Sequence, residues 1–326
     1  MLIRPRRTRT NQAIRSLVSE SRVTVDDLIQ PLFVMEGKSV KTPIKSMPGQ
    51  YRFSLDYLLE EIQTLKNLGI KAISLFPVID EKFKTTDARE AYNPNGLNQR
   101  AVKAIKDRFP EMLVMTDIAL DPYNRDGHDG LVDAKSGKIL NDQTLEVLNQ
   151  MALVQAQAGS DILGPSDMMD GRVLSLRQTL ESNSFQDVMI MSYSAKYASA
   201  FYGPFREALD SAPKSGDKKT YQMDFSNARE AVREALLDQE EGADILMVKP
   251  GLSYLDVVYQ CKQASHLPIA VYNVSGEYAM VMAAAEKGWV DADKIMLETL
   301  TAFKRAGADI ILTYFAKAMA ERLHRL

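Results

Sequence analysis

The chain has 326 residues, of which 45% are hydrophobic and 25% are charged, and its formal net charge at pH 7 is −3. This size and composition are typical of a globular enzyme with a large core, and they exclude a low-complexity or disordered chain. No segment approaches the roughly 20 apolar residues of a membrane helix, and a single cysteine, Cys261, excludes a disulfide within the chain.

The chain begins with the basic stretch MLIRPRRTRTNQAIRSL, which has no apolar segment of signal-peptide length. We therefore expect a cytoplasmic protein with no membrane contact. A transit peptide is an alternative, although Glu20, Asp26 and Asp27 argue against it. A nucleic-acid partner is disfavoured because the rest of the chain has no basic face or stacking motif. We expect residues 1–29 to form an arm for subunit contacts.

Short apolar runs bounded by turn residues predict eight strands in the rest of the chain. They lie at 30–36, 71–78, 112–120, 160–166, 188–196, 243–250, 267–274 and 308–315. Helical patterns with a glycine just past the end separate most of them, and the junction from helix to strand recurs as AGSDILG, EGADILM and AGADIIL. Apolar strands that alternate with helices form parallel sheets. The pattern predicts an α/β fold, a closed (β/α)8 TIM barrel over residues 30–326, with a doubly wound open sheet as the alternative.

Two of these strands end on a lysine. VMIMSYSAK ends on Lys196, and ADILMVK ends on Lys249, after which Ser253 and Asp256 form a predicted capping pair for the next helix. Catalytic residues of such barrels lie at the C-terminal ends of the strands. Burial and a second ammonium nearby each lower the pKa of a lysine, and a neutral amine forms a Schiff base with a ketone. We expect the two lysines to activate two carbonyl substrates; strand ends that reach solvent or a salt bridge are the alternative.

The segment that follows Lys196 is longer than a packing connection needs. It predicts an active-site lid over about residues 197–225 that carries the cations Arg206, Lys218 and Lys219. A mobile surface excursion is the alternative.

The third predicted strand ends in an acidic stretch, TDIALDPYNRDGHDG, which supplies Asp117, Asp121, Asp126, His128 and Asp129. Carboxylates beside a histidine suit a hard cation such as Mg²⁺, or they hold lysine ammonium groups and relay protons. A tight zinc site is disfavoured because no cysteine lies nearby. An acidic turn without a ligand is the alternative.

Other strand ends carry hydroxyl and carboxyl groups. Ser166 and Asp167 follow the fourth strand and suit hydrogen bonds to an imine or an amine. Tyr272, Ser275 and Tyr314 follow the seventh and eighth strands and suit a substrate carboxylate. A turn with a capping aspartate, and an ordinary helix N-cap at Ser275, are the alternatives.

Together, the motifs MVKPGLSYLD, SAKYASAFYGPFREA, PSDMMDGRV and AGADIILTYF resemble the 5-aminolevulinate dehydratase family, whose members are also called porphobilinogen synthases. The similarity runs from about the first strand to the C-terminus. It implies a hydro-lyase that condenses two molecules of 5-aminolevulinate into porphobilinogen with loss of two waters, an early step of haem and tetrapyrrole biosynthesis. It also implies a homo-octamer built from dimers and no organic cofactor.

The resemblance also implies a role for each candidate residue. Lys249 would form the Schiff base with one substrate, whose carboxylate Ser275 and Tyr314 would hold, and Lys196 would engage the second substrate. The remaining implied roles are binding of the second carboxylate by Arg206, Lys218 and Gln222, amine and proton transfer by Asp117, Ser166 and Asp167, and walls formed by Tyr202, Phe205 and Tyr272.

The chain departs from the zinc-dependent members of that family. Where they carry three cysteines, this chain has Ala119, Asp121 and Asp129, so it resembles the aspartate-rich branch and no catalytic zinc is expected. Many such members respond to Mg²⁺ at a separate site between subunits. Glu234 matches the glutamate that takes part there through water, which implies allosteric Mg²⁺. Lys218 stands where many relatives have arginine, and it loses bidentate carboxylate binding.

Two other functions fit the same residues. A Schiff-base aldolase uses the same chemistry. It usually needs only one reactive lysine and often has a phosphate-binding site, and no phosphate-binding loop is evident in this sequence. A non-catalytic barrel that serves as a binding or assembly module would keep the fold without the chemistry. Formation of a pyrrole from 5-aminolevulinate alone separates these readings.

Overall fold

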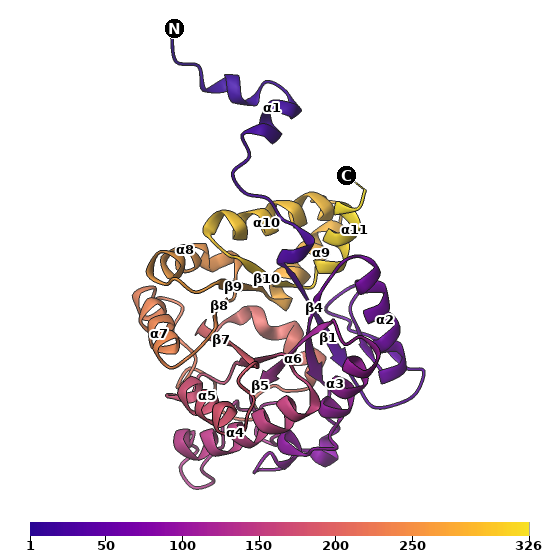
Figure 1. The fold of residues 1–326 in the computed structure, drawn as a ribbon, viewed down its shortest axis with the longest axis vertical. Helices are drawn as coiled ribbons and strands as arrows, with labels where there is room; N and C mark the ends of the chain where they lie inside the picture. The colour runs from indigo at the N-terminus through magenta and orange to yellow at the C-terminus, as the bar shows by residue number, and fades with distance from the viewer. Residues whose placement is uncertain (326) are drawn as a thin grey trace.

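Eight parallel strands close into a barrel at the centre of the molecule (Figure 1). The structure is a computed structural model that describes residues 1–325. Neighbouring strands follow one another in chain order, and pairing of the last with the first closes the ring. They are β1 (Leu28–Val34), β4 (Ala72–Pro77), β5 (Leu113–Ile118), β6 (Ile162–Pro165), β7 (Met189–Lys196), β8 (Ile245–Lys249), β9 (Ile269–Asn273) and β10 (Ile310–Thr313). The predicted (β/α)8 barrel is confirmed, and the open sheet is excluded.

Helices surround the barrel and cover the outer face of its strands (Figure 1). They are α2 (Leu55–Asn67), α3 (Leu97–Arg108), α4 (Asn141–Ala158), α5 (Arg172–Ser182), α7 (Arg229–Glu240), α8 (Leu255–Ala264), α9 (Ser275–Glu286), α10 (Ala292–Ala306) and α11 (Ala316–Leu323). The predicted glycine stops are present: Gly159 and Gly307 end α4 and α10 at φ of 104° and 112°, where a side chain would be strained. No helix within residues 1–325 is both long and apolar enough to cross a membrane.

Single turns of 3-10 helix occupy several of the connections. They are Pro5–Arg9, Val25–Asp27, Glu81–Phe83, Arg89–Tyr92, Ala200–Tyr202 and Leu252–Tyr254. The last of these directly precedes α8. The prediction that Ser253 and Asp256 cap this helix is wrong. The helix has no side-chain cap, and the Glu277 carboxylate instead accepts the backbone N–H of Leu252 at 2.7 Å.

Residues 1–22 extend away from the barrel, and none of them is buried (Figure 1). They contain the short helix α1 (Gln12–Leu17), whose N-cap Asn11 accepts the backbone N–H of Ile14 at 2.9 Å. Contact with the barrel begins at Val23, which is buried, and continues where Lys304 donates to the Asp27 carboxylate at 2.8 Å. The arm predicted over residues 1–29 therefore projects away from the barrel over residues 1–22. Its last two residues already belong to β1, which begins at Leu28.

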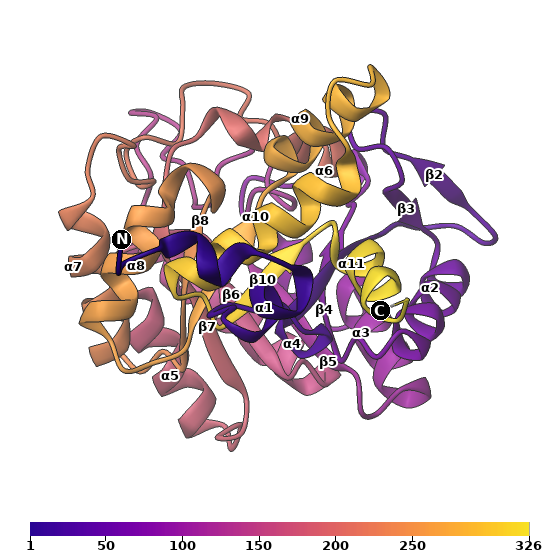
Figure 2. The same ribbon diagram turned by 90° about the horizontal axis from the view of Figure 1, so that it is seen from above.

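A hairpin that the sequence patterns did not indicate follows β1. Its strands are β2 (Lys41–Pro43) and β3 (Tyr51–Phe53), which pair antiparallel, while β3 adds parallel to β1. The hairpin stands out beside the ring of helices (Figure 2). Strands of three residues carry too few positions for a periodic pattern, which explains why they were missed.

The first turn of α9 packs closely against the connection that follows β7. A Cβ added at Gly276 would lie 2.5 Å from the carbonyl oxygen of Phe201 and 2.8 Å from its Cα. Main-chain atoms cannot give way as a flexible side chain can, so only glycine fits here.

We expect Gly276→Ala to lower the free energy of unfolding by at least about 1 kcal/mol, because the Phe201 backbone must move to admit the methyl group. Gly203→Ala is the matched control, since Gly203 begins the short helix α6 (Gly203–Leu209) at a helical φ of −50° and nothing lies within 4 Å of an added Cβ. Urea unfolding of both variants checks this. Equal stability of the two variants would contradict the close approach.

Candidate active site

The two strand-end lysines lie side by side at the C-terminal mouth of the barrel. Lys196 on β7 pairs with Lys249 on β8, which places both side chains on the same face of the sheet. This register depends on a β-bulge, because the strands pair as Ser192 with Leu246 and then as Ala195 with Val248. One extra residue of β7 is accommodated between these pairs, and without it Ala195 would stand opposite Lys249. The bulge therefore brings the two amines together.

Four aromatic rings surround the Lys249 ammonium. Their centroids lie 4.7–5.2 Å from Nζ, and the rings belong to Tyr193, Tyr202, Phe205 and Tyr272. The side chain is 6% exposed, and within residues 1–325 its Nζ makes no hydrogen bond or ion pair. Burial, together with the positive charge of Lys196, lowers the pKa of Lys249 to about 7. A large fraction of this amine is therefore neutral at neutral pH.

Lys196 is also buried, but it has a carboxylate partner. Its Nζ lies 3.2 Å from Asp129 Oδ2 and donates to the backbone carbonyl of Ser166. Lys218 reaches the same carboxylate from the lid, at 2.6 Å from Oδ1, and lies 3.3 Å from Asp121. Gln222 adds a third donor to Asp129 at 3.3 Å. One carboxylate is thus shared by two ammonium groups and an amide.

The three aspartates at the end of β5 and in the loop that follows it differ in protonation because their neighbours differ. Burial opposes ionisation of Asp129, but Lys196 and Lys218 outweigh it and hold its pKa well below the usual range. Burial raises the pKa of Asp117 to about 7, although the charges of Lys196 and Lys249 and a hydrogen bond from Ser166 oppose the shift. Burial and the charge of Asp129 raise the pKa of Asp121. Asp129 is the fixed anion, and Asp117 can exchange a proton near neutral pH.

Asp167 lies beneath this cluster and has no exposed surface. Its Oδ1 accepts the backbone N–H of Met169 at 2.8 Å, and its Oδ2 lies 4.0 Å from Nε of the buried Arg172. Burial raises the pKa of Asp167 to about 6, although Arg172 opposes the shift. Arg172 also pairs with Asp238 on α7 at 3.1 Å. Arg172 therefore links the loop that carries Ser166 and Asp167 to α7.

The hydroxyl groups predicted to bind a carboxylate lie on the Lys249 side of the mouth. The hydroxyl oxygens of Tyr272 and Tyr314 are 3.0 Å apart, and burial raises the pKa of both. Ser275 Oγ accepts the backbone N–H of Phe205 at 3.0 Å, so this hydroxyl binds the lid. Ser275 is the first residue of α9 and not its N-cap, so the N-cap alternative is wrong.

The segment predicted to form a lid contacts the mouth, because the Phe205 ring lies near Lys249 and Lys218 and Gln222 bind Asp129. It consists of a 3-10 turn, α6 and a loop. Tyr221 of the loop lies 3.0 Å from His128 Nδ1 and accepts the backbone N–H of Asp129 at 3.2 Å. The second ring nitrogen of His128 lies 3.0 Å from the Ser215 carbonyl oxygen. Arg206 on α6 is half-buried.

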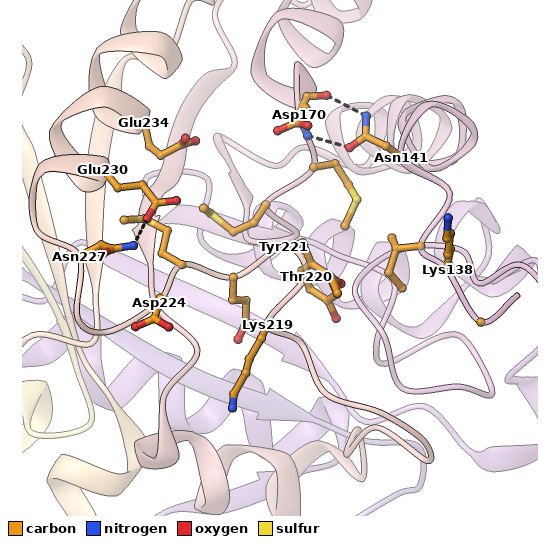
Figure 3. A pocket seen from close by; sticks show the side chains of 16 residues that line it. Lys138, Asn141, Asp170, Lys219, Thr220, Tyr221, Asp224, Asn227, Glu230 and Glu234 are labelled. Carbon is orange, nitrogen blue, oxygen red and sulfur yellow. Dashed lines mark hydrogen bonds between the residues drawn. The ribbon is translucent and has the colours of Figure 1, made fainter.

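Glu234 lies apart from the lysines. It is on the outer helix α7, in a pocket of about 700 Å³ that Asp170 and Glu230 also line (Figure 3). Burial raises the pKa of Glu234, and the charges of Asp238, Asp170 and Glu230 add to the shift against Arg172. Across residues 1–325, no three His, Cys, Asp or Glu side chains lie close enough together to hold a metal ion directly.

Tyr193 is a site residue that the sequence patterns did not indicate. Its ring lies 5.0 Å from the Lys249 ammonium and 6.0 Å from that of Lys196. Its hydroxyl is buried without a hydrogen-bond partner in the described chain. The sequence does place this aromatic residue three positions before a strand-end lysine. Regular alternation would put the two side chains on opposite faces of the strand, and the sequence does not show the bulge that changes this.

Comparisons with known proteins agree with this architecture. The family description "Delta-aminolevulinic acid dehydratase" matches residues 2–322. The delta-aminolevulinic acid dehydratase of Bradyrhizobium diazoefficiens is 53% identical over 324 residues, which cover 99% of this chain and 91% of the relative. That of Synechocystis is 50% identical over 323 residues, 98% of each chain.

Among solved structures, the fold is similar to that of delta-aminolevulinic acid dehydratase (porphobilinogen synthase) from Toxoplasma gondii, crystallised with the reaction product porphobilinogen. The TM-score is 0.98 at 52% sequence identity, over 100% of this chain and 93% of the other. The chain therefore belongs to the delta-aminolevulinic acid dehydratase family.

Proposed function

We propose that this chain condenses two molecules of 5-aminolevulinate into porphobilinogen with loss of two waters, through Schiff bases on Lys249 and Lys196. It acts as a lyase of tetrapyrrole biosynthesis. The observation that carries the proposal is the pair of buried lysines in register on β7 and β8, one of them with a pKa near 7. An amine must be neutral to attack a ketone, and Lys249 meets that requirement at neutral pH.

Lys249 forms the imine with the first substrate. The neutral amine adds to the ketone carbon, and the carbinolamine loses water when its oxygen receives a proton. Asp117, with a pKa of about 7, is suited to donate that proton and to accept one later. The Tyr314 and Ser275 hydroxyls are placed to hold the substrate carboxylate. Ser275 would turn its hydroxyl hydrogen from the Phe201 carbonyl oxygen, 3.4 Å away, to the carboxylate, while its Oγ continues to accept the Phe205 N–H. Tyr202, Phe205 and Tyr272 exclude water around the imine.

Lys196 engages the second substrate. It begins as an ammonium paired with Asp129 and must lose a proton before the amine can attack; Asp117, whose pKa is about 7, is suited to accept that proton. Lys218 and Gln222 bind Asp129 in the absence of substrate, and we propose that they turn, together with Arg206, to the second carboxylate when it enters. Asp121, already 3.3 Å from Lys218, would remain as its protein partner. Ser166 and Asp167 receive the substrate amine.

Allosteric Mg²⁺ is a further part of the proposal. Carboxylate oxygens suit this cation, and Mg²⁺ keeps several of its waters. Glu234 and Asp170 line an open pocket that admits a hydrated ion, whereas direct coordination by three side chains does not fit (Figure 3). Glu234 would hold the ion through its carboxylate or through water, and the bound charge would hold the neighbouring carboxylates ionised. No step of the reaction passes through this ion, and we propose no catalytic zinc or organic cofactor.

Assembly and location complete the proposal. The exposed arm of residues 1–22 is available for a second subunit, which supports a homo-octamer built from arm-exchanging dimers. We propose a cytoplasmic location, without nucleic-acid or membrane partners.

The proposed activity is tested by porphobilinogen formation from 5-aminolevulinate alone. We expect Lys249→Ala to abolish turnover and Lys196→Ala to lower it by at least about a thousandfold, because each amine forms its own imine. Borohydride reduction followed by mass spectrometry should still trap a single-substrate imine at Lys249 in the second variant. Activity close to wild type in either variant would rule out the mechanism with two Schiff bases. A product other than a pyrrole would favour an aldolase.

The pH dependence of amine reactivity follows from the lowered pKa of Lys249. Below about pH 7 the amine is protonated and has no free electron pair, and above it the neutral form dominates. We expect acetylation of Lys249 by a small reagent to reach half its maximal rate near pH 7, measured by peptide mass spectrometry. Labelling of the exposed Lys294 supplies the reference profile. A Lys249 midpoint above pH 9 would show that burial does not neutralise this amine.

Metal dependence is checked with metal-stripped protein to which Mg²⁺ or Zn²⁺ is returned, with a zinc-selective chelator in parallel. We expect activity that survives the chelator and rises with Mg²⁺. Glu234→Gln should remove the Mg²⁺ response and keep the basal rate, whereas the exposed Glu240→Gln on the same helix should keep both. Activity recovered only with Zn²⁺ would mean that Asp121 and Asp129 belong to a zinc site.

A further inference from the structure

Helix α6 carries two groups that the proposed reaction needs. The Phe205 ring lies 5.1 Å from the Lys249 ammonium, and Arg206 follows it. The helix has only seven residues, and a helix of that length is not stable alone in water. Its position over the mouth of the barrel therefore depends on contacts with the rest of the protein.

The N-terminal end of α6 is held by Ser275, as described above. Its C-terminal end is held by a side chain from the hairpin. Arg52 on β3 donates from Nε to the Ala208 carbonyl oxygen at 2.7 Å and from Nη2 to that of Glu207 at 2.5 Å. These carbonyl groups belong to the last turn of the helix, where intrahelical donors run out. The planar guanidinium fits two adjacent carbonyls, and its positive charge complements the helix dipole.

A second cation reaches the residue that follows the helix. Lys84 donates to the Asp210 carbonyl oxygen at 2.7 Å and lies 3.3 Å from the Glu81 carboxylate. The residue is 2% exposed. Asp210 has a positive φ of 51°, which turns the chain out of the helix at this point. Glu81 also binds Lys214 of the lid loop at 2.7 Å, so the same short segment after β4 contacts the lid twice.

We propose that Arg52 and Lys84 are positioning residues that hold the lid helix closed over the substrate. The inference rests on the proposed function, because it assigns Phe205 and Arg206 to substrate. Neither cation contacts the reactive lysines. They act by satisfying main-chain carbonyls of the lid from two different connections, the one after β1 and the one after β4. Loss of either contact releases the end of α6 and moves Arg206 and Phe205 away from the mouth.

The test compares Arg52→Met and Lys84→Met with matched controls. Lys45 is exposed in the same hairpin as Arg52, and Lys82 is exposed two residues from Lys84, so Lys45→Met and Lys82→Met remove equal charge without touching α6. We expect amide hydrogen exchange over residues 203–212 to accelerate about tenfold in the two lid-anchor variants, with exchange in β7 and β8 unchanged. KM for 5-aminolevulinate should rise about fivefold or more, with a smaller change in kcat. Arg52→Lys should restore part of both.

Each outcome decides the inference. Faster exchange confined to the lid together with a raised KM supports it. Unchanged lid exchange overturns it, and so does faster exchange that spreads into the barrel strands, which would indicate a general structural role. Faster lid exchange with an unchanged KM overturns the claim that the position of α6 sets substrate affinity. If the wild-type protein forms no porphobilinogen, the proposed function fails, and hydrogen exchange still reports whether these cations anchor the lid.

Discussion

The buried carboxylate of Asp129 determines how positive charge is distributed in this site. Three lysine side chains converge on the barrel mouth, and an ammonium ion is costly to bury without a partner. Asp129 pairs with Lys196 and Lys218, and Lys249 is left with aromatic rings alone. The least costly way to bury that third amine is to leave it neutral. The reactivity of Lys249 is thus a consequence of where the single strong anion lies, as much as of its own surroundings.

The lid completes this arrangement because one of the three cations belongs to it. Lys218 is buried against Asp121 and Asp129. Opening of the proposed lid would therefore remove a positive charge from the interior and expose Asp129 to water. The lid also brings the Phe205 ring against Lys249. Closure therefore changes the dielectric and the charge around both amines at once. In the proposed reaction, binding of substrate and preparation of the amines would consequently be coupled through one segment.

Much of this could be read from the sequence. The apolar runs and glycine stops located the eight barrel strands to within a few residues, and strand-end position alone marked Lys196 and Lys249. What escaped prediction depends on tertiary geometry. The hairpin around Arg52 is too short to show a pattern, and the cap expected at Ser253 is replaced by Glu277 from the next helix. The sharing of Asp129 depends on which of several acidic side chains points inward. Tyr193 was missed because nothing local reveals the bulge in β7.

The bulge in β7 determines which face of the sheet each later side chain of the strand occupies. Side chains of a strand alternate between its two faces, so the identity of a residue matters only together with the parity of its position. A substitution in β7 changes one side chain and keeps that parity. Loss of one residue between Ser192 and Ala195 would remove the bulge and leave Lys196 opposite Lys249. Gain of one residue, with the bulge unchanged, would instead turn Lys196 toward the helices and bring Ala195 beside Lys249. The barrel would still close, since its hydrogen bonds do not depend on side chains, yet its second amine would be outside. The number of residues between Ser192 and Lys196 therefore matters to the site as much as their identity.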